Sequence, residues 1–463
     1  MSEAEARSAL IVGGGISGLA TAWFLYRRGF EVRVLESASR VGGVIDTHRR
    51  DGYSVELGPN TTLQKPGRAE DALGRMLDET GLSARALEAA PAGQKRFILR
   101  NGKVLALPAS PPAFLTTPAF SPWAKLRLLR EPFIKPAVGE ESIAQFVTRR
   151  LGREFLDYAI DPFISGVYAG DTRQLSVQAA VPRIYELEQQ HGSLIRGAMA
   201  LGKVSKATGQ PKGRQISFAE GMAALPAGIA GKLPAGSLRT QAKVRRLEPL
   251  ESGWRVQVES SDGGPAEETA GTLVLALPAR EAAELIRPQL PEASGDLDEI
   301  PYVSIVTTGL GYRRDQITHP LDGFGFLVPR VEGVRTLGAL FSSSLFDGRA
   351  PEDHVLLTAF VGGAHDPEAA GLPDENIAVS LQTDLAAPLG IRGEPAFRRI
   401  TKWERAIPQY TLEHLDRIAN LDRHLASRPG LFLTGSWRGG ISVADCIRSA
   451  ETLAQGIAES FRD

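Results

Sequence analysis

The feature that most constrains the fold is a glycine pattern near the start of the sequence, Gly13-x-Gly15-x-x-Gly18. It follows a short apolar run and opens a stretch with helical spacing, residues 16–28, after which residues 31–35 return to a strand-like pattern. Strand, glycine turn, helix and strand form a βαβ unit. Glycines at these positions allow a tight turn, a close approach of the backbone to a pyrophosphate, and close packing of helix on strand. The pattern therefore predicts an α/β, Rossmann-like fold with a dinucleotide at the helix N-terminus.

An acidic residue at the end of the second strand narrows the choice of dinucleotide. Glu36 lies 18 residues after Gly18, which suits a carboxylate that accepts a hydrogen bond from a ribose hydroxyl. A carboxylate there would repel a 2′-phosphate, so the sequence disfavours NADP. The alternative is a glycine-rich turn without a ligand, and the strand, the helix and the acid together argue against it.

Bulk composition excludes several classes of protein. With 463 residues, of which 43% are hydrophobic and 23% charged, the chain is long enough for two or three globular domains. The formal net charge of −1 gives no overall attraction to nucleic acid. Cys446 is the single cysteine, so no intrachain disulfide can form. No run reaches the ~18 apolar residues that cross a bilayer, and residues 1–8 lack the apolar core of a signal peptide, so we expect a cytoplasmic protein.

The residue composition of the sequence changes after residue 105. Prolines and aromatic residues alternate at first, and helical patterns follow at residues 142–156 and 182–200. Residues 202–215 mix lysines with Gly, Ser and Thr and are predicted to form a loop. We therefore predict a helical insertion over residues 106–215. Elsewhere the spacing predicts strands over much of 242–277 and 303–361, and helices over 71–81 and 444–461.

Further glycine patterns follow the first one in order. Arg40-Val41-Gly42-Gly43 comes soon after Glu36, and Gly439-Gly440-Ile441-Ser442-Val443 follows the last short strand pattern at residues 431–435. In these segments the chain resembles the FAD-containing amine oxidase superfamily. The resemblance implies FAD as cofactor, with Arg40 at the pyrophosphate, Val443 offering a backbone N–H to the flavin, and residues 58–60 near the isoalloxazine. It also implies that Val244 contacts the adenine side.

The cofactor-binding residues predicted from the first motif and the resemblance together are Gly13, Gly14, Gly15, Ile16, Ser17, Gly18, Glu36, Ser37, Arg40, Gly42, Gly43, Gly58, Pro59, Asn60, Val244, Trp403, Gly435, Ile441, Ser442 and Val443.

Motifs along nearly the whole chain resemble the protoporphyrinogen and coproporphyrinogen oxidase family. They are K-R-F-I-L-R-N-G at 95–102, the segment 161–171, G-F-G-F-L-V-P at 323–329, and Trp403 with P-Q-Y at 408–410 and His414. The resemblance implies that Arg96 holds a substrate propionate, which the guanidinium fork can do bidentately. It places the Gly166 carbonyl against the tetrapyrrole, between apolar wall residues Phe324, Leu327, Leu340 and Phe360. Taken singly, each wall residue is better explained as a core residue than as a ligand contact, and Arg96 as a surface arginine on an edge strand; together, in family order, the motifs favour the pocket.

The implied reaction is the oxidation of protoporphyrinogen IX to protoporphyrin IX, in which six hydrogens leave in two-electron steps and oxygen accepts the electrons. We identify no general base among the seven histidines, so the catalytic residue stays unknown, and no metal-ligand cluster is present in the sequence. A coproporphyrinogen III oxidase is the nearest alternative, since its substrate carries four propionates against two. Another FAD amine-oxidase-like enzyme, or a non-catalytic escort-type protein on the same fold, are further alternatives. A homodimer and hand-off of product to a ferrochelatase are additional partner hypotheses.

The resemblance also implies three parts. A Rossmann-like FAD-binding domain is assembled from residues 1–85, 216–290 and 405–463, and a mixed α+β substrate-binding domain from 86–105 and 291–404. The insertion at 106–215 resembles a membrane-binding domain.

In that insertion, we expect four apolar side chains to enter a bilayer and three cations to meet its head groups, giving a peripheral membrane contact on the inner face. The apolar candidates are Phe114, Leu115, Phe120 and Trp123, and the cations are Lys125, Arg127 and Arg130. The alternative is that the apolar side chains pack against the insertion's own helices.

Overall fold

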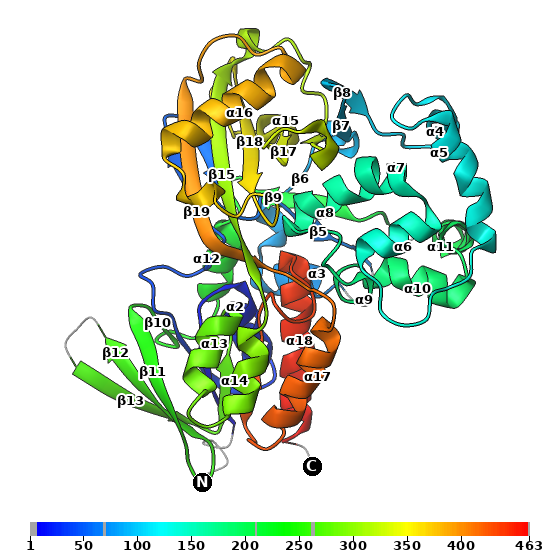
Figure 1. The fold of residues 1–463 in the computed structure, drawn as a ribbon. Coiled ribbons are helices and arrows are strands. Elements are labelled where there is room, and N and C mark those ends of the chain that lie inside the picture. Colours follow the sequence, from blue (N-terminus) through cyan, green and yellow to red (C-terminus); the bar gives the residue numbers. More distant parts are fainter. Residues whose placement is uncertain (1–6, 68–70, 209–210, 261–263, 462–463) are drawn as a thin grey trace.

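The computed structural model describes residues 7–67, 71–208, 211–260 and 264–461 (Figure 1). Most of the N-terminal segment 1–8 and residues 209–210 of the predicted loop therefore lie outside the described residues. Within the described ranges, no helix is long and apolar enough to cross a membrane.

A five-stranded parallel sheet forms the base of the molecule. Its strands, in the order β10-β2-β1-β14-β20, are Leu238–Arg239, Glu31–Leu35, Ser8–Val12, Thr272–Leu275 and Leu431–Leu433. The predicted βαβ unit is confirmed, because α2 (Ile16–Tyr26) connects β1 to β2. β1 is buried throughout, and its residues from Ala9 to Val12 are apolar because both faces of the sheet are covered. Ile11 belongs to a core with α2 and α18 (Val443–Glu459), while Leu10 faces a core on the other side.

The covering elements come from distant parts of the chain. On the face of α2 lie α3 (Ala72–Thr80) and α12 (Ala224–Ala230). The other face carries the antiparallel meander β11-β12-β13, with bounds Ala242–Pro249, Trp254–Ser260 and Gly264–Ala270. It also carries three helices, α13 (Ala279–Ile286), α14 (Pro291–Asp298) and α17 (His414–Leu425). The predicted helix 71–81 is confirmed: the Asp71 carboxylate accepts from Gly74 N at 3.0 Å, and Gly81 ends the helix at φ +75°.

A seven-stranded mixed sheet stands above the first one. Its order is β19-β15-β18-β17-β16-β7-β8, with bounds Phe397–Pro408, Tyr302–Arg313, His354–Gly362, Gly338–Leu340, Gly325–Leu327, Phe97–Arg100 and Lys103–Ala106. The early hairpin β7-β8 joins it through a parallel pairing of Phe97 with Phe326. Helix α16 (Asp374–Leu389) covers one face and contributes Ile377, Leu381 and Leu385 to its core.

Small sheets and short helices connect the two large ones. They are β3 Thr47–Arg50 paired with β4 Tyr53–Glu56, the three-stranded β5-β9-β6 (Thr62–Gln64, Arg214–Phe218, Ala86–Glu88), and α15 Ser342–Leu345.

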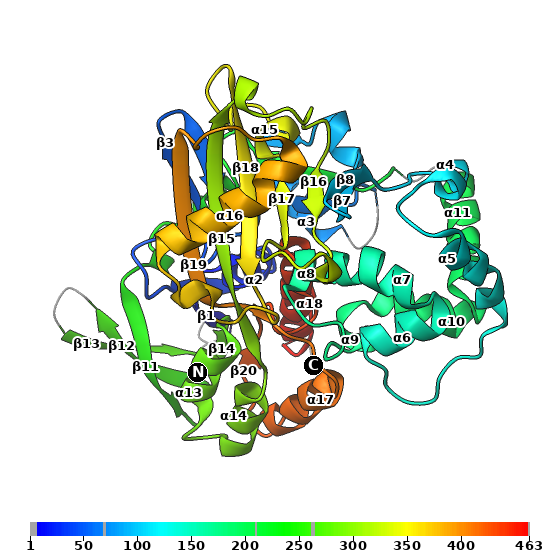
Figure 2. The same cartoon turned by 45° about the horizontal axis from the view of Figure 1, so that its top comes forward.

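Helices α4 to α11 form a group at one side of the molecule; α4 and α5 lie at its outer end, and α8 lies next to the mixed sheet (Figures 1 and 2). Their bounds are Pro111–Thr116, Pro122–Arg127, Ile143–Arg150, Arg153–Phe155, Asp161–Tyr168, Val177–Ala180, Pro182–His191 and Leu194–Thr208. Two predicted helices are interrupted by left-handed glycines, at Gly152 and Gly192. The prediction of a loop over 202–215 is wrong for most of its length: α11 continues to Thr208 and β9 begins at Arg214. Lysine is a good helix former, so the polar composition did not end the helix.

Candidate cofactor and substrate site

The first glycine motif forms the turn between β1 and α2, and its three glycines are glycine for different reasons. A Cβ at Gly13 would lie 2.3 Å from Ala276 O, and one at Gly18 would lie 1.9 Å from Gly13 O. The protein itself therefore requires glycine at both positions. A Cβ at Gly15 would meet no protein atom within 4 Å, and its backbone is extended at φ −71°. No protein atom therefore requires glycine at position 15, which agrees with the predicted close approach of a pyrophosphate there.

Glu36 is fixed beside this turn. Its carboxylate accepts hydrogen bonds from Gly14 N and from Ala38 N, each at 2.7 Å. The hydroxyl of Ser37 lies 3.3 Å from the same carboxylate. An ionised carboxylate has about four acceptor positions, so it can still receive a ribose hydroxyl.

The second glycine motif is hydrogen-bonded to the first. Gly42 N donates to Gly14 O at 2.8 Å, and Gly15 and Gly42 form an isolated parallel bridge. The Arg40 guanidinium donates to Gly43 O at 2.7 Å and lies 3.3 Å from Asp46. Arg40 thus orders its own loop in this structure, and its contact with a pyrophosphate stays a prediction.

The third motif lies beside the first although the two are at opposite ends of the sequence. Helices α2 and α18 pack on the same face of the parallel sheet, with Val443 and Ile16 in one apolar cluster. The thiol of Cys446 contacts Ser17, and its burial raises the pKa of the thiol to about 11. Ser442 caps α18 by accepting from Asp445 N at 3.1 Å. Two helix N-termini therefore open toward one region, an arrangement that favours a long ligand carrying phosphate at one end.

The remaining predicted cofactor residues lie in connecting segments. Trp403 on β19 donates its indole N–H to Leu57 O at 2.7 Å, directly before the loop Gly58-Pro59-Asn60. Asn60 donates to Gly58 O at 3.1 Å. Trp403 thus orients this loop through its backbone. Val244 lies at a bulge of β11, and Gly435 follows β20.

Arg96 and Phe324, predicted from separate motifs, come together. The guanidinium carbon of Arg96 lies 4.7 Å from the centroid of the Phe324 ring, a cation–π arrangement. Phe324 N also donates to Lys95 O at 2.8 Å. Desolvation lowers the pKa of Arg96, although part of its side chain reaches solvent. Among the described residues, no carboxylate pairs with Arg96, so its charge can receive a ligand carboxylate.

The wall predicted from β16, β17 and β18 occupies one face of the mixed sheet. Leu327 and Phe360 both pair with Gly338, and Leu340 lies two residues beyond it. Cross-strand partners share a face, and so do residues two apart. The three apolar side chains therefore lie on one half-exposed face, while the alternate residues, such as Phe326, are buried in the core. Gly166 on α8 faces this wall, since a Cβ there would lie 2.8 Å from Leu327 Cδ2.

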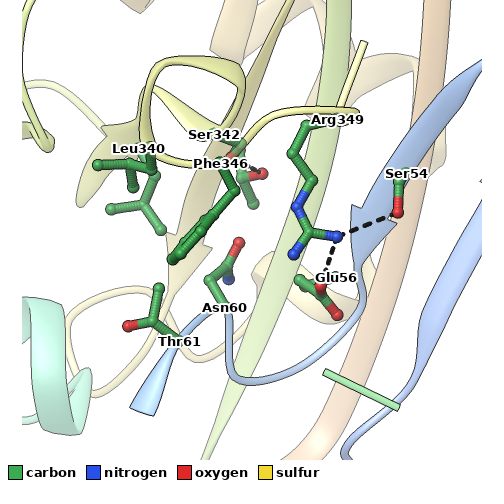
Figure 3. A pocket seen from close by; sticks show the side chains of 10 residues that line it. Ser54, Glu56, Asn60, Thr61, Leu340, Ser342, Phe346 and Arg349 are labelled. Atoms are coloured by element: carbon green, nitrogen blue, oxygen red, sulfur yellow. Dashed lines mark hydrogen bonds and ion pairs between the residues drawn. The ribbon is translucent and has the colours of Figure 1, made fainter. Parts of the chain in front are cut away.

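A small pocket brings a predicted cofactor residue and a predicted wall residue together: Asn60 and Leu340 both line it (Figure 3). Its floor holds a buried ion pair, Arg349 with Glu56 at 3.1 Å, and Arg349 also donates to Ser54 at 3.2 Å. Desolvation raises the pKa of Glu56, and Arg349 opposes that shift. Sequence reasoning missed this pair, because Arg349 lies in a polar turn sequence that looks like solvent-exposed loop.

Comparison with known proteins gives the class and then the relatives. The family model of flavin containing amine oxidoreductase matches residues 16–458. Protoporphyrinogen oxidase 2, chloroplastic/mitochondrial, of Arabidopsis thaliana is 33% identical over 95% of this chain and 91% of its own length. Coproporphyrinogen III oxidase of Bacillus subtilis is 30% identical over 95% of each. A solved structure from Exiguobacterium sp. 255-15, provisionally named a protoporphyrinogen oxidase, has a TM-score of 0.82 at 26% identity and covers 99% of this chain and 100% of its own.

A chain with this fold and these three motifs is an FAD-dependent oxidoreductase. It belongs to the flavin containing amine oxidoreductase family, within which it is similar to the protoporphyrinogen and coproporphyrinogen III oxidases. The α/β fold and the FAD cofactor predicted from the sequence are thereby confirmed. The roles of single residues stay predictions.

Proposed function

We propose that this protein oxidises protoporphyrinogen IX to protoporphyrin IX, with oxygen as the electron acceptor. The observation that carries the proposal is the Arg96 guanidinium beside Phe324, which no carboxylate of the described ranges pairs, next to an apolar wall of Leu327, Leu340 and Phe360. A flat, mostly apolar macrocycle with carboxylates at its edge matches a cation at the rim of such a wall. Relatives named as protoporphyrinogen oxidases support the choice of substrate.

The chain's own residues bind and orient. Arg96 holds a propionate bidentately and so fixes the rotation of the macrocycle. Leu327, Leu340 and Phe360 exclude water from one of its faces, and Gly166 lets the backbone of α8 approach. Bound FAD supplies the two-electron chemistry.

Two of the histidines with lowered pKa values, His414 and His319, serve as packing groups. His414 is 2% exposed and stacks on Tyr410, and burial lowers its pKa to about 4. His319 packs edge-on against Phe97 and burial lowers its pKa as well. Neither is assigned the proton that leaves a pyrrole N–H, so we propose no catalytic base.

Substitution of Arg96 tests the proposal directly. Arg96→Ala should raise KM for protoporphyrinogen by about tenfold to a hundredfold, since it removes a charge-assisted bond. The purified variant should stay yellow, because Arg96 is not predicted to touch FAD. Lys95→Ala is the matched control: Lys95 is the neighbouring cation but already pairs with Asp322 at 2.6 Å. An unchanged KM in Arg96→Ala, with Lys95→Ala equally unaffected, would refute the propionate assignment.

A coproporphyrinogen III oxidase is the second candidate. Relatives with that name, from Bacillus subtilis and Propionibacterium freudenreichii, are 30% and 31% identical over 95% and 97% of this chain. Coproporphyrinogen carries four propionates, so it requires more cationic or open polar surface than Arg96 alone supplies. Measurement of kcat/KM for both porphyrinogens on the same preparation decides between the two. A higher value for coproporphyrinogen III would replace the first proposal.

We also propose a peripheral membrane contact through the helical insertion, with a different set of side chains from the one predicted. Phe120 is only 5% exposed and stacks on Phe155 at 4.5 Å, with Phe114 beside them. Those two phenylalanines therefore pack against the insertion's own helices. Leu115 and Trp123 are exposed as predicted, at 71% and 79%. They are joined by further exposed apolar side chains, namely Leu126, Leu129, Phe133 and Val138.

Two of the three predicted cations already donate hydrogen bonds to backbone carbonyls of the protein. Lys125 donates to Leu115 O and Thr117 O at 2.9 and 2.7 Å, and Arg127 donates to Thr148 O at 3.0 Å. Arg130 is exposed between the apolar residues. The proposed contact therefore depends mainly on apolar burial, with a smaller contribution from charge.

A further inference from the structure

The P-Q-Y segment at 408–410 lies where three parts of the molecule meet. Tyr410 follows β19 and is 2% exposed. Its hydroxyl donates to Ser436 O at 2.7 Å and accepts from Gly440 N at 2.9 Å. Both partners belong to residues 436–442, which lead from β20 into α18 and which we call the flavin-facing loop. One side chain thus satisfies two backbone groups of the segment proposed to approach the flavin.

The same segment is fixed to the helical insertion on its other side. Ser176 N donates to Tyr410 O at 2.8 Å, and Leu175 forms a bridge with Thr411. The neighbouring Gln409 donates its side-chain amide to Tyr168 O, at the end of α8, at 2.9 Å. The position of Tyr410 is therefore set by the insertion that also presents Gly166 to the wall.

The ring of Tyr410 is held by aromatic packing. It stacks on His414 at 4.2 Å between centroids with planes 11° apart, and Tyr168 meets it edge-on at 5.8 Å. A tyrosine side chain has few rotatable bonds, so fixing the ring fixes the hydroxyl oxygen. The hydroxyl oxygen of Tyr410 is therefore held in place independently of the flavin-facing loop.

The flavin-facing loop needs an anchor of this kind. Gly439 and Gly440 have φ values of +80° and +121°, and glycine loses more conformational freedom on ordering than any other residue. Ser442 lies two residues after Gly440 and is the N-cap of α18, whose first residue is Val443. Without a restraint at Gly440, the entry into α18 would vary, and with it the direction of the first helical N–H groups.

We infer that Tyr410 is a positioning residue: its hydroxyl holds the flavin-facing loop in register with the helical insertion, so that α18 begins where the flavin is to be bound. The inference rests on the proposed placement of the flavin at Ile441, Ser442 and Val443. It connects the part of the chain that contacts the substrate with the part that contacts the cofactor. The P-Q-Y segment thereby acquires a role that its sequence alone did not indicate.

Tyr410→Phe isolates the hydroxyl and keeps the ring. Titration of the apoprotein with FAD should give a dissociation constant about tenfold higher than in the wild type, because Ser436 O and Gly440 N lose a buried partner. The bound flavin should be more fluorescent and its visible spectrum shifted, and kcat should fall while KM for the porphyrinogen stays the same. Amide hydrogen exchange at Gly440 in the apoprotein should be faster than in the wild type, which gives a second measurement without FAD.

Tyr168→Phe is the matched control. Tyr168 is buried in the same aromatic cluster, but its hydroxyl donates to Ala180 O at 2.9 Å, inside the insertion. This variant should leave the FAD dissociation constant, the flavin spectrum and the exchange of Gly440 unchanged. Equal effects of Tyr410→Phe and Tyr168→Phe on FAD affinity would overturn the inference in favour of a general packing role. An unchanged FAD affinity and Gly440 exchange in Tyr410→Phe would overturn it as well.

These outcomes are distinct from failure of the proposed function. A wild-type protein that binds FAD but oxidises neither porphyrinogen would refute the activity, and the titration would still decide the role of Tyr410. A wild-type protein that binds no FAD would refute both.

Discussion

At the scale of single residues, neighbouring glycines in one motif have separate causes. Gly13 and Gly18 are required by protein atoms less than 2.5 Å from an added Cβ, whereas Gly15 has open space around it. A motif of this kind therefore combines a folding requirement with a binding requirement. The folding requirement and the binding requirement can be separated by experiment, because alanine at Gly18 should affect the stability of the fold, whereas alanine at Gly15 should affect FAD binding.

Gly15→Ala should fold normally and bind FAD about tenfold or more weakly, since the methyl group occupies the path of the pyrophosphate. Gly18→Ala should lower the free energy of unfolding of the apoprotein by about 1–3 kcal/mol, because its Cβ would lie 1.9 Å from Gly13 O. Urea unfolding of both apoproteins and an FAD titration measure the two effects. Normal FAD affinity in Gly15→Ala would contradict the cofactor placement.

A buried histidine gives a pH dependence of stability. Burial holds the pKa of His414 at about 4 in the folded protein, below its ordinary 6.5. Between those values the unfolded chain binds a proton that the folded chain does not, so stability falls as pH drops from about 6.5 to 4, by about 3 kcal/mol in all. Above pH 6.5 both states are neutral and this contribution is constant.

His414→Phe keeps the stacking on Tyr410 and removes the titration. The difference in unfolding free energy between pH 7 and pH 5 should be smaller in this variant than in the wild type. Tyr168→Phe, in the same aromatic cluster, is the control and should leave the difference as it is, because a phenol does not ionise between pH 5 and pH 7. Parallel pH profiles for wild type and His414→Phe would show that His414 does not titrate as described.

At the scale of elements, the proposed substrate wall depends on the register of three short strands and one helix. β16, β17 and β18 place Leu327, Leu340 and Phe360 on one face, and α8 closes on that face at Gly166. The contact between Gly166 and the tip of Leu327 is tight, but the leucine side chain can move. A change here should therefore alter the shape of the wall more than the stability of the fold.

Gly166→Ala should leave the thermal midpoint within about 2 °C of the wild type and raise KM for the porphyrinogen roughly fivefold, as Leu327 is displaced toward the substrate. FAD affinity should not change. Gly202→Ala on α11 is a suitable control, because a Cβ there meets no protein atom within 4 Å. If Gly166→Ala and Gly202→Ala gave the same KM, α8 would not line the substrate.

At the scale of the whole molecule, we propose that the division into a cofactor part (1–85, 216–290 and 405–463), a substrate part (86–105 and 291–404) and the insertion (106–215) corresponds to three tasks. The six exposed apolar side chains proposed to meet the membrane (Leu115, Trp123, Leu126, Leu129, Phe133 and Val138) belong to α4, α5 and the segment after α5. These elements lie on the side of the molecule away from the parallel sheet (Figures 1 and 2). A bilayer on that side would leave the sheet in water.

Trp123→Ser combined with Phe133→Ser should lower partitioning onto phosphatidylcholine–phosphatidylglycerol vesicles about tenfold or more, because both side chains lose apolar burial in the interface. Co-sedimentation measures this, and Trp fluorescence of the wild type should shift to shorter wavelength on binding. Val379→Ser, exposed at 55% on α16, should bind like the wild type. Equal partitioning of all three proteins would refute the proposed surface.

The sequence by itself determined the dinucleotide fold, since the reasons for Gly18 and Glu36 lie within a short βαβ unit, and the resemblance of its three glycine motifs to a known superfamily indicated FAD. It also suggested Arg96 and the wall residues, through the resemblance of their motifs to those of the porphyrinogen oxidase family. Only the tertiary structure decided that Arg96 meets Phe324, that Phe120 is covered while Trp123 is exposed, and that Tyr410 reaches Gly440. Those contacts join segments that are separated in the sequence. Local residue patterns predict helices and strands, but they do not identify the partner that a side chain meets after folding.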